Sequence, residues 1–336
     1  MSQARRGADT LSGCRGPRGA LKDRSGGLAY LTGACVRRND CQGGPRVPGR
    51  GLARVRAPRS WTGLRKVARV TTGGPRRLAY PTAAHEKAAE AVVGMFRHLA
   101  PVPAVILRGS CARGRATRDS CVDIVVLTSD AASPDDRRTL EQSWERAYRV
   151  EAVYETLRSV GRFSHVDLDV TDGRFAEPPR GWTSGPDSFE LEIGNTVAYT
   201  VPLWQRGEAF NRLAGQWLPY YDDARRARRL AATIGFARNN LAHVPLYVER
   251  GLYFQAFHRL YHAFQEFLQA LFIAHRTYPI AYDKWIREQI EEILGLPDLY
   301  RQLPGLFEYR RFESDELTAR AEHLERLLGE YAVTRG

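Results

Sequence analysis

The sequence predicts an α+β protein in which an α/β domain is followed by an all-α helical bundle. Three observations predict it. Residues 1–80 are rich in Arg, Gly and Pro and lack hydrophobic periodicity. Apolar runs typical of buried strands alternate with helical patterns over residues 81–205, and residues 206–336 show helical spacing throughout. We therefore expect a disordered tail, an α/β domain and a bundle over these three ranges.

The basic tail accounts for the positive charge of the whole chain. The net charge is +12, but residues 1–80 hold 18 basic and 3 acidic residues, which leaves 32 basic and 35 acidic residues in 81–336. The tail could be a nucleic-acid arm, a targeting peptide, a dispensable extension or a stretch outside the native reading frame. Because the expected domains carry no basic excess, we do not expect long nucleic acid as a partner.

Other features of composition indicate a cytoplasmic protein without a role in membranes. The longest apolar runs fall short of the roughly 20 residues that span a bilayer. The five cysteines are odd in number and show no paired metal-ligand or zinc spacing, and we do not expect disulfides. The oligomeric state is left open, with a homodimer as one option.

Capping and periodicity predict the elements of the α/β domain. Ser133 begins a helix with Pro at the first position and acids in the first turn. In chain order we expect a helix from Thr82 to Leu99, strands over Val105–Leu107 and Val122–Leu127, a helix from Ser133 towards Gly161, and strands over Phe163–Val170 and Phe189–Pro202.

Helical spacing predicts the bundle, with helices near 222–248, 252–276, 283–294 and 314–332. The second of these carries an apolar stripe, which we interpret as bundle core in preference to a ligand cleft. The stripe consists of Phe257, Leu260, Tyr261, Phe264, Phe267, Leu268, Leu271 and Phe272.

The stretch from Leu107 to Leu127, LRGSCARGRATRDSCVDIVVL, carries the chemistry. Gly109 permits a tight turn and close approach of a phosphate. Ser110 offers a hydroxyl at the start of a following helix, whose N–H groups favour an anion. Asp123 then lies on the next strand.

This pattern resembles the DNA polymerase beta-like nucleotidyltransferase superfamily, in particular its minimal and antibiotic-modifying branches. The matching residues are Gly109, Ser110, Ala112-Arg113-Gly114, Ala116-Thr117, Ser120 and Asp123. The resemblance implies a small mixed β-sheet and a cleft that binds an NTP, ATP first, with Mg²⁺. It also implies transfer of the nucleoside monophosphate to a hydroxyl of a small-molecule or protein acceptor. The bundle would then resemble HEPN or kanamycin-nucleotidyltransferase helical domains.

The chain departs from this family at Cys121, where the first Asp of the metal-binding pair is expected. A thiol is a poor ligand for the hard Mg²⁺ ion. Two alternatives stay open. One is an active enzyme that uses other carboxylates. The other is altered metal use or weakened catalysis, which would include a catalytically impaired protein that binds nucleotide or regulates.

The resemblance places a third carboxylate on a later strand, as metal ligand or base. Asp167 and Asp169 are the candidates because alternation puts both on one face. Together with Asp123 they form the predicted catalytic and metal-binding set, with Asp169 slightly preferred.

Weaker signals add candidates for substrate binding. Gly109, Ser110 and Arg113 are predicted to hold the nucleotide. Glu190 and Glu192, alternating on an expected strand, could orient an acceptor, and Lys284 with Trp285 could contact substrate; a surface strand and a packing cluster are the alternatives. The six residues from Arg238 to His243 resemble the Arg-x4-His motif of HEPN proteins, which would imply an RNase or a toxin–antitoxin-type component; a polar cluster without a catalytic role is the alternative.

Overall fold

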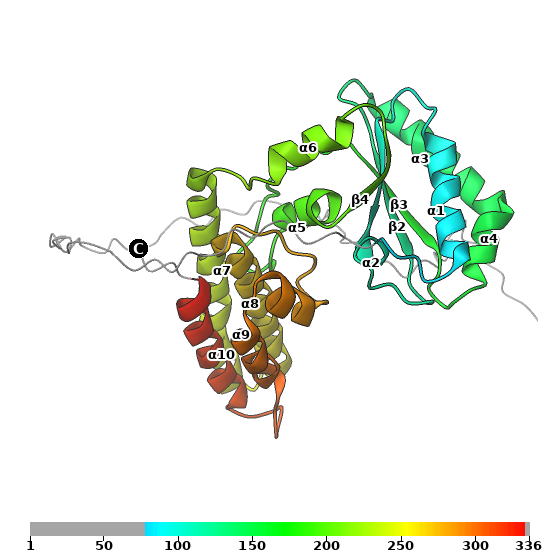
Figure 1. Ribbon diagram of the computed structural model, residues 1–336. Helices are drawn as coiled ribbons and strands as arrows, with labels where there is room; N and C mark the ends of the chain where they lie inside the picture. Colours follow the sequence, from blue (N-terminus) through cyan, green and yellow to red (C-terminus); the bar gives the residue numbers. More distant parts are fainter. Residues whose placement is uncertain (1–77, 333–336) are drawn as a thin grey trace, which may run out of the picture. The chain divides into compact units, whose positions relative to one another are not determined.

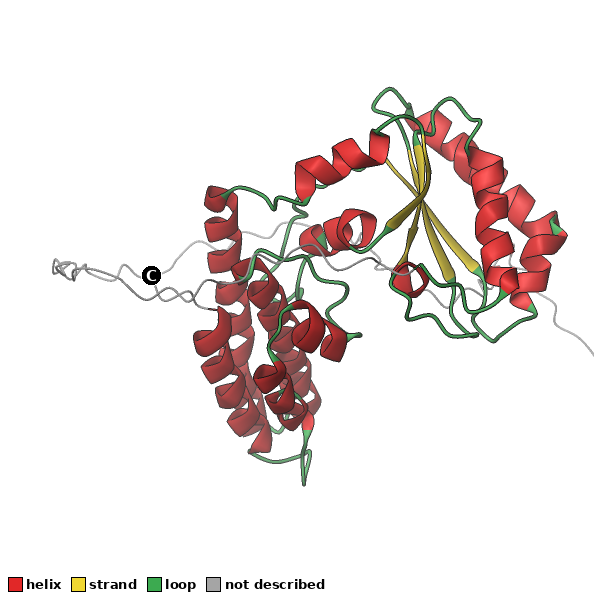
Figure 2. Cartoon of the chain, in the orientation of Figure 1, coloured by secondary structure: helices red, strands yellow, loops and turns green. Residues whose placement is uncertain are grey.

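The computed structural model describes residues 78–332 of the chain. The tail predicted over 1–80 therefore lies almost wholly outside the described residues. Within 78–332 the α+β class is confirmed: a mixed sheet with flanking helices precedes a helical region (Figure 2). The domain boundary at residue 205 stays a prediction.

The sheet has four strands in the order β3-β2-β1-β4. These are β1 (Ala104–Arg108), β2 (Val122–Leu127), β3 (Val166–Thr171) and β4 (Val201–Gln205). β1 runs antiparallel to both of its neighbours, whereas β2 and β3 are parallel. A parallel pair needs a crossover connection, and the chain between β2 and β3 supplies it as two helices.

Alternate residues of β1 contribute to two hydrophobic clusters, one on each face of the sheet. Val105 and Leu107 pack with α1 (Ala83–Phe96), α3 (Pro134–Val150) and α4 (Ala152–Arg158). Ala104 and Ile106 pack with Phe210 of α6 (Ala209–Trp217). Figure 1 shows the three helices on one side of the sheet and α6 on the other. The buried strands thus have their apolar residues covered on both faces.

The helix start predicted at Ser133 is confirmed as a complete capping box. The Ser133 hydroxyl accepts a hydrogen bond from the Asp136 amide, and the Asp136 carboxylate accepts one from the Ser133 amide. The helix does not continue unbroken, because Glu151 takes an extended backbone and separates α3 from α4.

The strand predicted over Phe189–Pro202 is wrong for most of its length. The structure has α5 (Phe189–Ile193), a π-helical turn over Gly194–Ala198 and only then β4. Phe189 and Ile193 are both fully buried at helical spacing, and apolar residues at alternate positions had mimicked a strand. Gly194 permits the turn to pack closely, since a Cβ there would lie 2.1 Å from the Pro279 carbonyl oxygen.

The helical region is built on a hairpin of two long helices, α7 (Asp223–Glu249) and α8 (Tyr253–Ala274), which are joined by a short turn. The apolar stripe of α8 is confirmed as core, with Leu260, Phe267 and Leu271 fully buried. Around the hairpin lie π-helical turns over Glu288–Ile293 and Leu328–Ala332, α9 (Pro297–Gln302), a 3-10 turn over Pro304–Phe307 and α10 (Glu316–Leu327). In residues 78–332, no helix combines the length and apolarity needed to cross a membrane.

Candidate active site

The site begins at the turn after β1, where Gly109 brings the backbone against Asp123. Gly109 has a φ of +71°, and a Cβ at this position would lie 1.9 Å from Oδ2 of Asp123. Arg108, the last residue of β1, is paired with Asp123 in the β1–β2 register. The missing side chain of Gly109 therefore leaves the space that the Asp123 carboxylate occupies, and α2 (Gly109–Ala112) begins at this turn.

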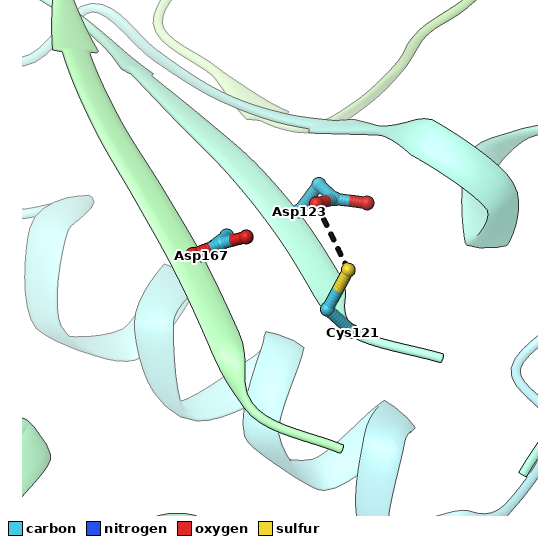
Figure 3. A group of neighbouring side chains, drawn as sticks. All are labelled: Cys121, Asp123 and Asp167. Atoms are coloured by element: carbon cyan, nitrogen blue, oxygen red, sulfur yellow. Dashed lines mark hydrogen bonds between the residues drawn. The ribbon is translucent and has the colours of Figure 1, made fainter. Parts of the chain in front are cut away.

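Three potential metal ligands from two strands meet beside this turn. Ligand atoms of Cys121, Asp123 and Asp167 all lie within 4.8 Å of one another. Cys121 Sγ donates a hydrogen bond to Oδ1 of Asp123 at 3.2 Å, and Asp167 extends from the neighbouring strand (Figure 3). The register explains the group, since Asp123 and Asp167 are direct partners in the parallel β2–β3 pair. We call these three residues the donor group.

Asp169 is not a member of the donor group. Asp169 lies two residues beyond Asp167 on β3, where its partner in the same register is Val125. Its carboxylate forms an ion pair with Arg108. Of the two acids predicted as third carboxylate, the structure thus brings Asp167 to Asp123. A metal-binding role for Asp169 stays a prediction.

The environment gives the two carboxylates opposite pKa shifts. Burial raises the pKa of Asp123 above its ordinary value, against the opposing effects of the Cys121 hydrogen bond and Arg108. Asp167 has a lowered pKa, first because His165 hydrogen-bonds to it; His165 Nε2 lies 3.5 Å from Asp167 Oδ1. Burial also raises the pKa of the Cys121 thiol to about 12, so that this thiol is protonated at neutral pH.

Lys284 is the positive charge that the helical region presents to the donor group. Its side chain is exposed, and its charge lowers the pKa of both Asp123 and Asp167. Gln289 holds the turn by donating to the Lys284 carbonyl at 3.0 Å. The next residue, Trp285, has a φ of +60°, an unusual backbone for a bulky side chain that is found where surrounding contacts enforce it.

Arg113, predicted to bind nucleotide, is held in contacts within the protein. Its side chain is 6% exposed, and Nε donates to Oε1 of Glu288 at 2.9 Å. The guanidinium also lies over the Trp285 ring, 4.9 Å from the centroid. These contacts tie the GSCARG turn to the Lys284–Trp285 turn, while phosphate binding by Arg113 stays a prediction.

Glu190 and Glu192 lie on α5 and not on a strand, so the alternation expected for them is wrong. Glu190 is fully buried and accepts hydrogen bonds from Arg229 Nε at 2.6 Å and from the Tyr221 hydroxyl at 2.7 Å. Glu192 is exposed and accepts one from Ser188. Neither carboxylate belongs to the donor group, and Glu190 serves a buried ion cluster instead.

The residues of the HEPN-like motif also make local contacts. Arg238 Nε donates to Glu325 of α10 at 2.8 Å. His243 bonds through Nδ1 to the Asn239 carbonyl at 2.6 Å. A catalytic role for this pair stays a prediction.

Sequence reasoning missed the parts that Arg108 and His165 play. Arg108 binds Asp169 and lowers the pKa of Asp123, and His165 lowers that of Asp167. The positions of these residues in the sequence could have indicated their roles. Arg108 directly precedes the Gly-Ser turn, and His165 alternates with the acids of β3.

Comparison with known proteins identifies the segment that carries this site. Residues 89–161, less than half of the chain, match the family model of the nucleotidyltransferase domain. The match includes Gly109, Ser110, Cys121 and Asp123 and ends before β3. Residues 89–161 thus match the nucleotidyltransferase domain family that the sequence motif predicts.

Other comparisons are more distant. A nucleotidyltransferase-like protein from Exiguobacterium sibiricum 255-15 is 14% identical over 73% of this chain and 77% of its own, with a TM-score of 0.39. A toxin–antitoxin crystallised with AMP-PNP is 20% identical over 43% of this chain and 94% of its own, with a TM-score of 0.27. A search of curated proteins found no match.

Proposed function

We propose that the protein transfers a nucleoside monophosphate from an NTP to a hydroxyl of a small-molecule or protein acceptor, with ATP as the first candidate for the NTP. One observation carries the proposal: a segment that matches the nucleotidyltransferase domain folds so that Gly109 seats Asp123 beside Asp167. A glycine turn next to converging carboxylates suits a triphosphate with its cation.

The donor group fits a divalent cation only in part. Asp123 and Asp167 offer the oxygen ligands that such ions accept. When bound, the ion would neutralise charge on the phosphates and polarise the reacting phosphoryl group. The thiol of Cys121, however, does not suit Mg²⁺, the ion that the family resemblance predicts.

Protein side chains supply the remaining steps in this proposal. Ser110 and the turn backbone hold phosphate oxygens, and Lys284 compensates the negative charge of the triphosphate. The acceptor oxygen forms a bond to the α-phosphorus while the bond from that phosphorus to the bridging oxygen breaks, so that pyrophosphate leaves. The hydroxyl proton passes to solvent water, while His165 keeps the Asp167 carboxylate ionised.

The charge of the domains supports a compact acceptor. With 32 basic and 35 acidic residues in 81–336, this part of the chain lacks the excess of Lys and Arg that a polyphosphate backbone requires. A small molecule or a protein side chain with a free hydroxyl avoids that requirement.

The proposal is tested with α-³²P-labelled NTPs, one at a time, and a pyrophosphate-release assay on the full chain. Wild type should release pyrophosphate and retain label on an acceptor, and Asp123→Asn should abolish both. Asp130→Asn is the matched control, because Asp130 follows the far end of β2 and its side chain is 86% exposed. Loss of turnover in both variants, or in neither, would contradict the proposal.

A second function, nucleotide binding without turnover, is favoured by one observation, the thiol in the donor group. Calorimetry that shows NTP binding while no pyrophosphate appears would support it. In that case Cys121→Asp should raise cation-dependent turnover.

A further inference from the structure

We propose that the donor group binds a single divalent cation of the zinc class, which accepts sulfur, and binds Mg²⁺ poorly. The proposal concerns the identity of the ion; the use of that ion in nucleotidyl transfer rests on the proposed function. It follows from the departure of Cys121 from the family pattern combined with the observed position of its sulfur atom.

The geometry places sulfur and oxygen donors around one point. Cys121 and Asp123 are two residues apart, so their side chains project to the same side, and Asp167 faces them across the β2–β3 register. All three ligand atoms lie within 4.8 Å of one another. Three protein ligands with one open position is the arrangement of catalytic zinc sites, whereas Mg²⁺ prefers six oxygens.

Charges around the donor group favour one ion over two. A second ion would need a further free carboxylate, and the nearest acid on β3, Asp169, is already paired with Arg108. Lys284 adds a positive charge that acts on Asp123. A second cation would therefore enter a site where positive charge is already supplied by the protein.

Neighbouring groups also contact the donors, as the groups around the ligands of known metal sites do. The Gly109 backbone lies against the Asp123 carboxylate, and His165 lies 3.5 Å from Asp167. On binding, the sulfur–metal bond forms, the thiol proton passes to solvent, and the hydrogen bond from Cys121 to Asp123 is lost.

Titration of the full chain with Co²⁺, without nucleotide, tests the proposal. Thiolate coordination produces a sulfur-to-cobalt charge-transfer band in the near ultraviolet, which Zn²⁺ should then displace and equimolar Mg²⁺ should not. Cys121→Ser should remove the band and weaken Co²⁺ binding by more than the roughly 10–100-fold that is lost when a group hydrogen-bonded to a metal ligand is removed.

Other cysteines provide the controls. Cys111→Ala should keep the band, because its buried sulfur points to the Cys121 carbonyl, 3.5 Å away, and not to the donor group. A triple serine variant of Cys14, Cys35 and Cys41 should keep it as well. Thermal melts of each variant show whether a lost band reflects lost folding.

Cys121→Asp tests the opposite change, because it gives the donor group oxygen ligands only. This variant should bind Mg²⁺ more tightly and Co²⁺ more weakly than wild type does. The proposal is overturned by a missing band in wild type, by a band that survives Cys121→Ser, or by an unchanged Co²⁺ to Mg²⁺ preference in Cys121→Asp. A band without turnover would sink the proposed function alone, and Mg²⁺-driven turnover without a band would sink this inference alone.

Discussion

Replacing Gly109 with alanine would put a methyl group where the Asp123 carboxylate lies. The added Cβ would be 1.9 Å from Oδ2 and 2.8 Å from Cγ of Asp123. An ordinary contact between such atoms needs about 3.5 Å, so the carboxylate has to move by more than about 1 Å. It would leave the position in which it meets Cys121 and Asp167.

Two separate effects contribute to the expected loss. Alanine at a φ of +71° costs roughly 1–2 kcal/mol of folding free energy. Displacement of a reacting or ligating group by about 1 Å can cost on the order of 100-fold in rate. We therefore expect a modest loss of stability together with a loss of Co²⁺ binding and turnover of about 100-fold.

Gly251→Ala separates the two effects. Gly251 has nearly the same φ, +68°, and a Cβ there would meet nothing within 4 Å. Urea unfolding should show similar destabilisation in both variants, whereas only Gly109→Ala should lose cation binding by calorimetry. Equal cation affinity in the two variants would refute the role of Gly109 as the support of Asp123.

Three further outcomes are expected. Lys284→Met should raise the KM for nucleotide by roughly 10–100-fold, which is what the loss of a hydrogen bond to a charged group costs. The Arg287 side chain is 70% exposed, so the control Arg287→Met should leave the KM unchanged. Equal KM values in the two variants would show that Lys284 is not part of the site. Arg229→Met leaves buried carboxylates without their ion-pair partner and should lower the free energy of unfolding in urea by about 3–5 kcal/mol. The control Arg228→Met, at a neighbouring side chain that is 62% exposed, should lower it by less than about 1 kcal/mol. Similar losses in the two variants would contradict a buried cluster. Glu266 of α8 is fully buried and accepts hydrogen bonds from Arg180 and Asn240. Burial outweighs these contacts and raises the pKa of Glu266 to about 7, so the carboxyl group holds in the folded state a proton that it releases above pH 4.5 in the unfolded state. Stability from this group should fall by about 3 kcal/mol as pH rises from 4.5 through 7, and a Glu266→Gln variant with the same pH profile as wild type would disprove it.

Local signals predicted much of the α/β part. β2 has the bounds expected from its apolar run, Val122–Leu127, and the capping box at Ser133 begins α3. Residues 189–198 were mistaken for a strand because the decisive partner is remote. Glu190 pairs with Arg229 of α7, and a contact over that sequence distance leaves no trace in local periodicity.

The donor group shows the same limit. Alternation along β3 gives Asp167 and Asp169 the same face, so the sequence could not choose between them. The register of β2 and β3 makes Asp167 the direct partner of Asp123 and so places it in the donor group. Asp169 instead forms an ion pair with Arg108. Register depends on how two strands far apart in the chain are aligned, and a single sequence does not contain that alignment.

The parallel pairing of β2 with β3 has a consequence for biosynthesis. A nascent chain that has emerged from the ribosome only as far as α4 holds Cys121 and Asp123 but lacks their third partner. The two strands can join only after β3 has been synthesised, and such long-range pairing forms slowly. Capture of a metal ion by all three donors would thus report that β3 has paired with β2, and would favour the finished sheet by mass action.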